Sequence, residues 1–169
     1  MPTDLGGEVA ELLSQLIRNS CVNDGTLESG HEDRSAQTIE AALEGHGLDL
    51  QSYEPFPGRR SLVARIEGRR PDAPSLALVG HTDVVPADPS EWRHDPFGGE
   101  LIDGEVWGRG AVDMLNLTSS MAVAIRHLAD EGYRPEGDLV FIAVADEEAL
   151  GDHGAGWLVD NATAEVRTD

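Results

Sequence analysis

Three short segments of the chain carry side chains that bind metal ions or move protons. His81 follows the apolar run Leu76–Val79, Asp146–Glu148 follow the apolar run Leu139–Val144, and Asp113 lies between the two. Because apolar runs of this length are typical of buried strands, His81 and the acidic triplet are expected where strands end. Open α/β sheets bind ligands at the carboxyl ends of their strands. An imidazole and carboxylates that converge there indicate a zinc site.

The spacing within each segment suggests separate roles. His81 and Asp83 are two residues apart, so both side chains project from one face of an extended segment. Asp83 can then orient His81, because a metal-bound imidazole usually has an oxygen on its other ring nitrogen. Glu147 and Glu148 are adjacent and converge on one site only if the backbone turns after the strand. Two carboxylates in different environments can divide the roles of metal ligand and general base.

Each segment also has an ordinary explanation. Asp113 precedes a helical apolar stripe over residues 117–128 and is suited to an N-cap. Asp146–Glu148 alone could be a solvated acidic turn. His31 and His46 lie at the two ends of a predicted helix and are expected to be surface or capping groups. The combination of three ligand-bearing segments favours the metal site.

The rest of the pattern predicts an α/β fold with a mixed sheet flanked by helices. Strands are expected over residues 48–54, 61–67, 76–79 and 139–144, with a hairpin over 99–108 that turns at Asp-Gly. Helices are expected over residues 5–18, from 31 or 32 to 45 or 47, from 114 to about 132 and around 155–159. Because the order is not strict βαβ alternation, both strand directions are expected. In the long loop 87–98, Trp92 either lines a substrate wall or pins the loop to the core.

Composition excludes several classes of function. With 169 residues, 40% of them hydrophobic, the chain is large enough for one domain with a core. A net charge of −20 argues against nucleic acid as a partner, because phosphate binding needs a basic face. No apolar run approaches the roughly 20 residues of a membrane span, and the first residues lack a basic signal region, so a cytoplasmic protein is expected. The lone Cys21 is expected to be an idle thiol, and the absence of lysine excludes Schiff-base chemistry.

The motifs together resemble one known family. They are, in order, Gly80–Pro86, Trp92 with Asp95–Phe97, Gly108–Met114, and Asp146–Glu148 with Gly151 and Gly154. In order and spacing they resemble the dizinc metallopeptidases and deacylases that include aminoacylase, acetylornithine deacetylase, succinyl-diaminopimelate desuccinylase and the glutamate carboxypeptidases. The resemblance implies a zinc-peptidase-like catalytic domain with two zinc ions, or cobalt in their place. It also implies hydrolysis of an amide bond in N-acyl amino acids or small peptides.

By position, the resemblance implies a role for each site residue. His81 would bind the first metal and Asp83 would orient it. Asp113 would bridge both metals, which carboxylates do when two cations lie about 3.5–4 Å apart. Glu148 would bind the second metal, and Glu147 would be the general base.

The family has metal ligands beyond those present here, an acidic one after Glu148 and a histidine near the end of a longer chain. The run Val166–Asp169 resembles the approach to that acidic ligand, whereas Leu115 stands where the family often has lysine. We therefore expect residues 1–169 to be one partial catalytic domain, incomplete on its C-terminal side and without the lid and dimerisation domain. The sequence does not decide whether the parent enzyme is a homodimer. The alternative is a non-catalytic or weakly metal-binding truncated domain, because the site would be under-coordinated.

Overall fold

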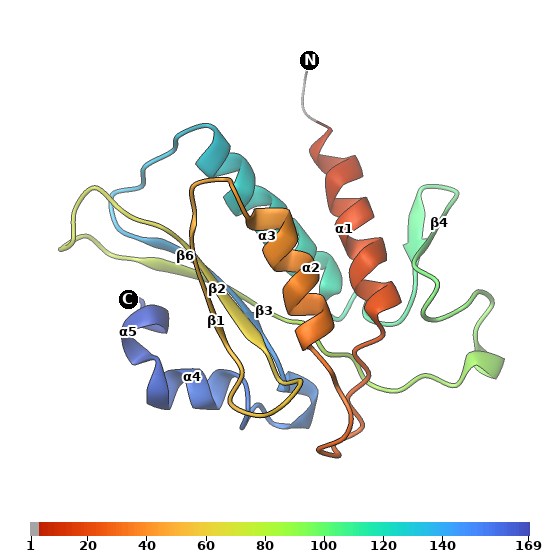
Figure 1. Cartoon of the computed structure of the whole chain (residues 1–169). Coiled ribbons are helices and arrows are strands. Elements are labelled where there is room, and N and C mark those ends of the chain that lie inside the picture. The colour runs from red at the N-terminus through yellow and green to blue at the C-terminus, as the bar shows by residue number, and fades with distance from the viewer. Residues whose placement is uncertain (1–3) are drawn as a thin grey trace.

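A four-stranded mixed sheet forms the centre of the computed structural model, which describes residues 4–169 (Figure 1). Its strands lie in the order β1 (Asp49–Tyr53), β2 (Ser61–Ile66), β6 (Leu139–Val144) and β3 (Leu76–His81). β2 pairs antiparallel with both β1 and β6, whereas β3 and β6 are parallel. The predicted α/β fold with a mixed sheet is confirmed. Because β3 and β6 run the same way, their carboxyl ends meet at one edge of the sheet.

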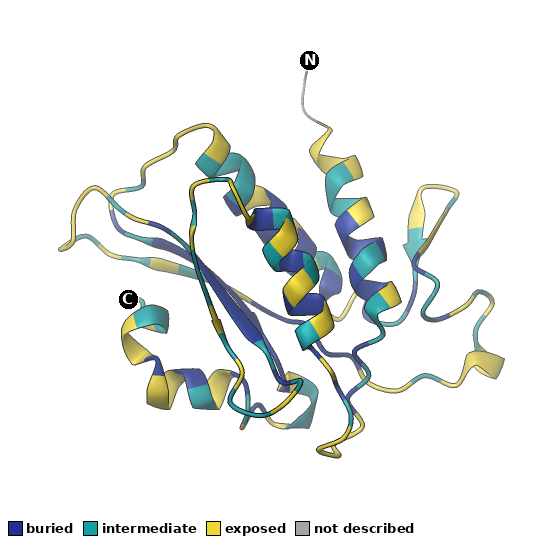
Figure 2. Ribbon diagram, viewed as in Figure 1, coloured by how far each residue is buried: buried dark blue, intermediate teal, exposed yellow. Residues whose placement is uncertain are grey.

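Helices cover both faces of this sheet. α1 (Leu5–Asn19), α2 (Asp33–Leu43) and α3 (Leu115–Asp130) pack on one face, and α4 (Ala155–Asn161) and α5 (Thr163–Val166) lie on the other (Figure 1). Alternate residues of a strand point to opposite faces. Phe141 of β6 therefore packs beneath the three long helices, while its neighbour Ile142 packs against α4. β6 is buried along its whole length, which makes its carboxyl end a fixed reference for the residues that follow (Figure 2).

The remaining elements lie in the connections. A 3₁₀ turn, η1 (Pro89–Glu91), interrupts the long loop that was predicted, and β4 (Glu100–Ile102) and β5 (Glu105–Trp107) form the expected hairpin. A second 3₁₀ turn, η2 (Glu147–Ala149), begins three residues after the end of β6. α5 was not predicted, because four residues carry too little periodicity to be recognised.

Two predicted boundaries of α2 were wrong by a few residues. The helix begins at Asp33, since His31 has a left-handed backbone with φ 58°, and it ends at Leu43. His31 is exposed, and His46 lies at the surface with its Nδ1 2.6 Å from Asp130 Oδ1.

Within residues 4–169, no helix has the length and apolar character needed to cross a membrane.

Candidate metal centre

His81 is the last residue of β3, and its side chain is almost fully buried. Its Nδ1 lies 2.9 Å from the backbone oxygen of Asp83 and 3.4 Å from Asp83 Oδ1. On the other side of the ring, Nε2 lies 3.3 Å from Asp113 Oδ1 and 3.7 Å from Glu147 Oε2. Asp83 thus occupies one ring nitrogen and leaves the other directed at carboxylates, as a metal ligand requires.

Asp113 reaches the site from the segment that precedes α3. The N-cap of α3 is Met114, and its side chain makes no capping hydrogen bond. The N-cap role considered for Asp113 is therefore not the one that the structure shows. The Asp113 carboxylate is 84% exposed and faces the buried His81 imidazole. A ligand approaching from solvent would meet this carboxylate first.

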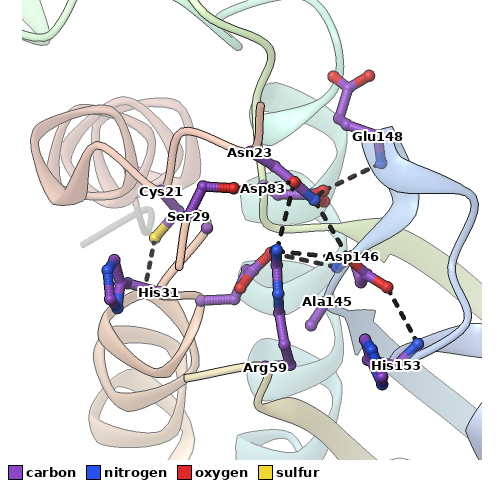
Figure 3. A network of polar contacts seen from close by, with 12 residues as sticks. Cys21, Asn23, Ser29, His31, Arg59, Asp83, Ala145, Asp146, Glu148 and His153 are labelled. Atoms are coloured by element: carbon purple, nitrogen blue, oxygen red, sulfur yellow. Dashed lines mark hydrogen bonds and ion pairs between the residues drawn. The ribbon is translucent and has the colours of Figure 1, made fainter. Parts of the chain in front are cut away.

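The acidic triplet turns as soon as β6 ends. Asp146 adopts a left-handed backbone with φ 63°, and η2 follows it. Asp83 holds this turn, because its Oδ1 accepts from the Glu147 amide at 3.2 Å. Its Oδ2 accepts from the Glu148 amide at 3.0 Å (Figure 3). The backbone therefore turns where convergence of the two glutamates requires it, since their carboxylates would lie on opposite faces of a continuing strand.

The charges at the site are strongly coupled. Burial acts to lower the pKa of His81, but the hydrogen bond and charge of Asp83, with the charge of Glu147, raise it to about 9. Burial likewise opposes ionisation of Asp83, yet hydrogen bonds from His81, Asn23 and the Glu148 amide hold its pKa below the usual value. Burial, together with the nearby carboxylates, raises the pKa of Glu148 despite the charge of His81. A cation at this site would relieve the repulsion among the carboxylates.

The donor types here fit a zinc ion, since imidazole and carboxylate are its usual nitrogen and oxygen ligands. Asp113 and Glu147 face His81 Nε2 directly. Glu148, which is predicted to be the ligand of the second metal, follows Glu147 in the turn, and its carboxylate points away from Asp83 (Figure 3). Within residues 4–169, however, no three His, Cys, Asp or Glu side chains are already gathered closely enough to hold a metal. The structure therefore brings the predicted ligands into one region without closing them into a complete cage.

Comparison with known proteins identifies the family. Residues 77–169, more than half of the chain, match the model of peptidase family M20/M25/M40. The chain belongs to this family. The M20 assignment confirms the resemblance drawn from the motifs. All the predicted site residues lie within the matched range.

Individual M20 relatives extend over nearly the whole chain. Succinyl-diaminopimelate desuccinylase of Maricaulis maris is 34% identical over 172 residues, which cover 99% of this chain and 41% of that enzyme. An M20 metallo-carboxypeptidase of Sulfolobus solfataricus superposes with a TM-score of 0.75 at 21% identity, over 96% of this chain and 36% of that one. A dinuclear metal-binding M20 peptidase of Bacillus subtilis gives a TM-score of 0.60 at 19% identity, over 95% and 41%. The chain thus spans about two fifths of the length of the curated relatives that it matches.

The predicted M20 site rests on a buried polar group that sequence reasoning missed. Arg59 Nη1 lies 2.7 Å from Glu32 Oε1 and 3.5 Å from Asp146 Oδ1, and Asn23 lies between Asp146 and Asp83 (Figure 3). Four of these five side chains carry charge in their usual ionised forms, yet each of the five residues is at most 3% exposed. No motif marks Asn23, Glu32 or Arg59, because each stands alone in an irregular or polar stretch.

Glu32 makes the stability of the folded protein depend on pH. Burial raises the pKa of Glu32 from 4.5 to about 7, although Arg59 opposes the shift. The folded protein therefore binds this proton more tightly than the unfolded chain. The stabilisation is complete below pH 4.5 and is lost as the pH rises through about 7.

Glu32→Gln should remove this dependence, because glutamine keeps the shape and carries no titrating proton. We expect the free energy of unfolding of the wild type to fall, relative to that of Glu32→Gln, as the pH rises from 4.5 to 7. Urea unfolding at several pH values would measure the difference. Glu44→Gln, at an exposed position, is the control. Parallel pH profiles for wild type and Glu32→Gln would contradict the prediction.

Trp92 of the long loop lies against Arg109. The guanidinium carbon of Arg109 lies 5.3 Å from the centre of the Trp92 ring, a cation–π distance. This contact ties the long loop to the segment that leads to Asp113. A core contact by Trp92, as the pinning explanation expects, stays a prediction. A substrate contact by Trp92 stays a prediction.

Proposed function

We propose that this chain supplies part of the catalytic centre of a zinc-dependent hydrolase that cleaves amide bonds in N-acyl amino acids or small peptides. The observation that carries the proposal is His81, held through Nδ1 by Asp83 and facing Asp113 and Glu147 through Nε2. Membership of the M20 family supports the reaction class. In this proposal His81, Asp113 and Glu148 bind metal, with two zinc ions in the complete site.

Bound zinc would polarise the scissile carbonyl and lower the pKa of water. Side chains of this protein would orient the ligand, transfer the proton and hold the cations. Asp83 keeps Nδ1 of His81 occupied, so Nε2 is the nitrogen that is free to bind. Glu147 takes a proton from the attacking water at its carboxylate and passes it to the leaving amine; its side chain is 55% exposed, so substrate can reach it. Asp113 and Glu148 add the negative charge that retains the cations.

The proposal extends to the location, the substrate and the domain organisation of the enzyme. We place it in the cytoplasm, with a small acylated amino acid or peptide as substrate. Nucleic acid is not among its proposed partners, because a net charge of −20 repels the phosphate backbone. Residues 1–169 would form one partial catalytic domain, and the lid and dimerisation domain of a homodimeric enzyme would lie outside them.

A second candidate is a domain that binds metal weakly and does not catalyse. It is favoured by one observation, that residues 4–169 hold no ready cluster of three metal-binding side chains. An incomplete ligand set lowers affinity, because the cation keeps water where a protein ligand is needed.

Metal content separates the two candidates. After dialysis, we expect the wild type to retain zinc and His81→Ala and Asp113→Ala to lose it, measured by elemental analysis. His46→Ala is the matched control, since His46 pairs with Asp130 at the surface, away from the site. Retention by wild type and control alone supports the hydrolase centre. A wild type without zinc would favour the second candidate and count against the proposal.

A further inference from the structure

Asn23 lies at the junction between two parts of the metal centre. It belongs to the loop between α1 and α2, and its backbone amide donates to the Val84 oxygen at 2.8 Å. Its side-chain Nδ2 donates to Asp83 Oδ2 at 2.8 Å and to Asp146 Oδ1 at 3.3 Å (Figure 3). One buried amide therefore contacts the carboxylate that orients His81 and the carboxylate that begins the acidic turn.

The surroundings fix which way this amide points. The guanidinium of Arg59 lies 3.4 Å from Asn23 Oδ1, and the Gly25 amide donates to the same oxygen at 3.1 Å. The Ser29 hydroxyl donates to it as well, at 3.3 Å. Three donors thus face the oxygen, and two carboxylates face the nitrogen. Since a carboxylate only accepts and a guanidinium only donates, the reverse orientation would lose these contacts.

The buried carboxylate of Asp83 needs the hydrogen bond that Asn23 donates. Its carboxylate is fully buried and accepts from Asn23 and from the Glu147 and Glu148 amides, while it faces His81 Nδ1. Without Asn23, Oδ2 of Asp83 would keep the Glu148 amide alone. A partner that hydrogen-bonds a metal ligand directly, as Asp83 does for His81, typically changes metal affinity 10–100-fold, and Asn23 acts on that partner.

We infer that Asn23 is a positioning residue of the metal centre, which holds Asp83 and Asp146 in place and thereby fixes His81 and the Glu147–Glu148 turn. The inference rests on the proposed function. It assigns Asn23 no contact with metal or substrate. The role differs from a structural one because it predicts a loss of metal affinity larger than any loss of stability explains.

The test compares Asn23→Ala with Asn19→Ala. Asn19, at the end of α1, donates to Arg34, Ser35 and Thr38 of α2 and makes no contact with the metal centre. Both variants lose amide hydrogen bonds and should be destabilised, Asn23→Ala more than Asn19→Ala because its lost bonds go to buried carboxylates. Zinc affinity is measured by competition with a chromogenic chelator, and stability by urea unfolding of the metal-free chains. The visible absorption of the cobalt-loaded chains reports the ligand geometry.

We expect Asn23→Ala to weaken zinc binding by roughly 10-fold or more and to alter the cobalt spectrum, with Asn19→Ala close to wild type in both. Equal affinities for the two variants would overturn the inference and leave the proposed function intact. A wild type that binds neither metal would overturn both. If Asn23→Ala does not fold, Asn23→Ser, which keeps a polar group without the reach of the amide, takes its place under the same criteria.

Discussion

Arg59→Met is expected to lower the free energy of unfolding by about 3–5 kcal/mol, as removal of one partner of a buried ion pair does. Arg59 is 1% exposed and faces Glu32 at 2.7 Å and Asp146 at 3.5 Å. Methionine fills much of the same space but leaves the two carboxylates without a cation. Glu32 can respond by taking up a proton, because burial already raises its pKa to about 7. Asp146 also faces Asn23 and the His153 amide, so its carboxylate keeps these two donors.

Urea unfolding of Arg59→Met measures this effect, with Arg69→Met as the matched control. Arg69 pairs with Glu136 at the surface and is 60% exposed, so its loss should change stability by no more than about 1 kcal/mol. The double variant Glu32→Gln with Arg59→Met should recover part of the loss, since it removes one of the stranded carboxylates. Similar stabilities for Arg59→Met and Arg69→Met would show that the buried pair does not hold the fold.

The contrast between the predicted and the missed residues has a physical basis. β6 was recognised because an apolar run between turn residues has few alternatives. His81, Asp113 and the acidic triplet stood out because they carry metal-binding groups next to such runs. The fold and the region of the site follow from patterns that are local in the sequence.

Asn23 carries no local signal of its role. It lies 60 positions before Asp83 and 123 before Asp146, and only the packed sheet brings the three together. The same holds for Glu32 and Arg59, whose charges would ordinarily indicate solvent-exposed positions. Sequence periodicity reports which face a residue occupies, but it does not report which distant polar groups meet in the interior. The polar groups behind the predicted metal ligands are therefore visible only in the structure.

Gly154→Ala is expected to lower the free energy of unfolding by about 2–3 kcal/mol, the upper part of the usual range for overpacking. Gly154 directly precedes α4, and a Cβ placed on it would lie 1.8 Å from the backbone oxygen of Ala145. That oxygen cannot rotate away as a side chain does, so the chain around Asp146 must move. Because Asp146 starts the turn that presents Glu147 and Glu148, we also expect weaker zinc binding.

Gly6→Ala provides the comparison for this substitution. Gly6 lies in the first turn of α1, where a Cβ would have its nearest neighbour, Asp4 Oδ1, at 3.8 Å. Alanine there should leave stability unchanged or raise it by up to about 1 kcal/mol, because it favours the helix more than glycine does. Urea unfolding and zinc competition on both variants measure the two effects. If Gly154→Ala matched Gly6→Ala in stability and in zinc affinity, the close approach of α4 to the end of β6 would not be what holds the acidic turn.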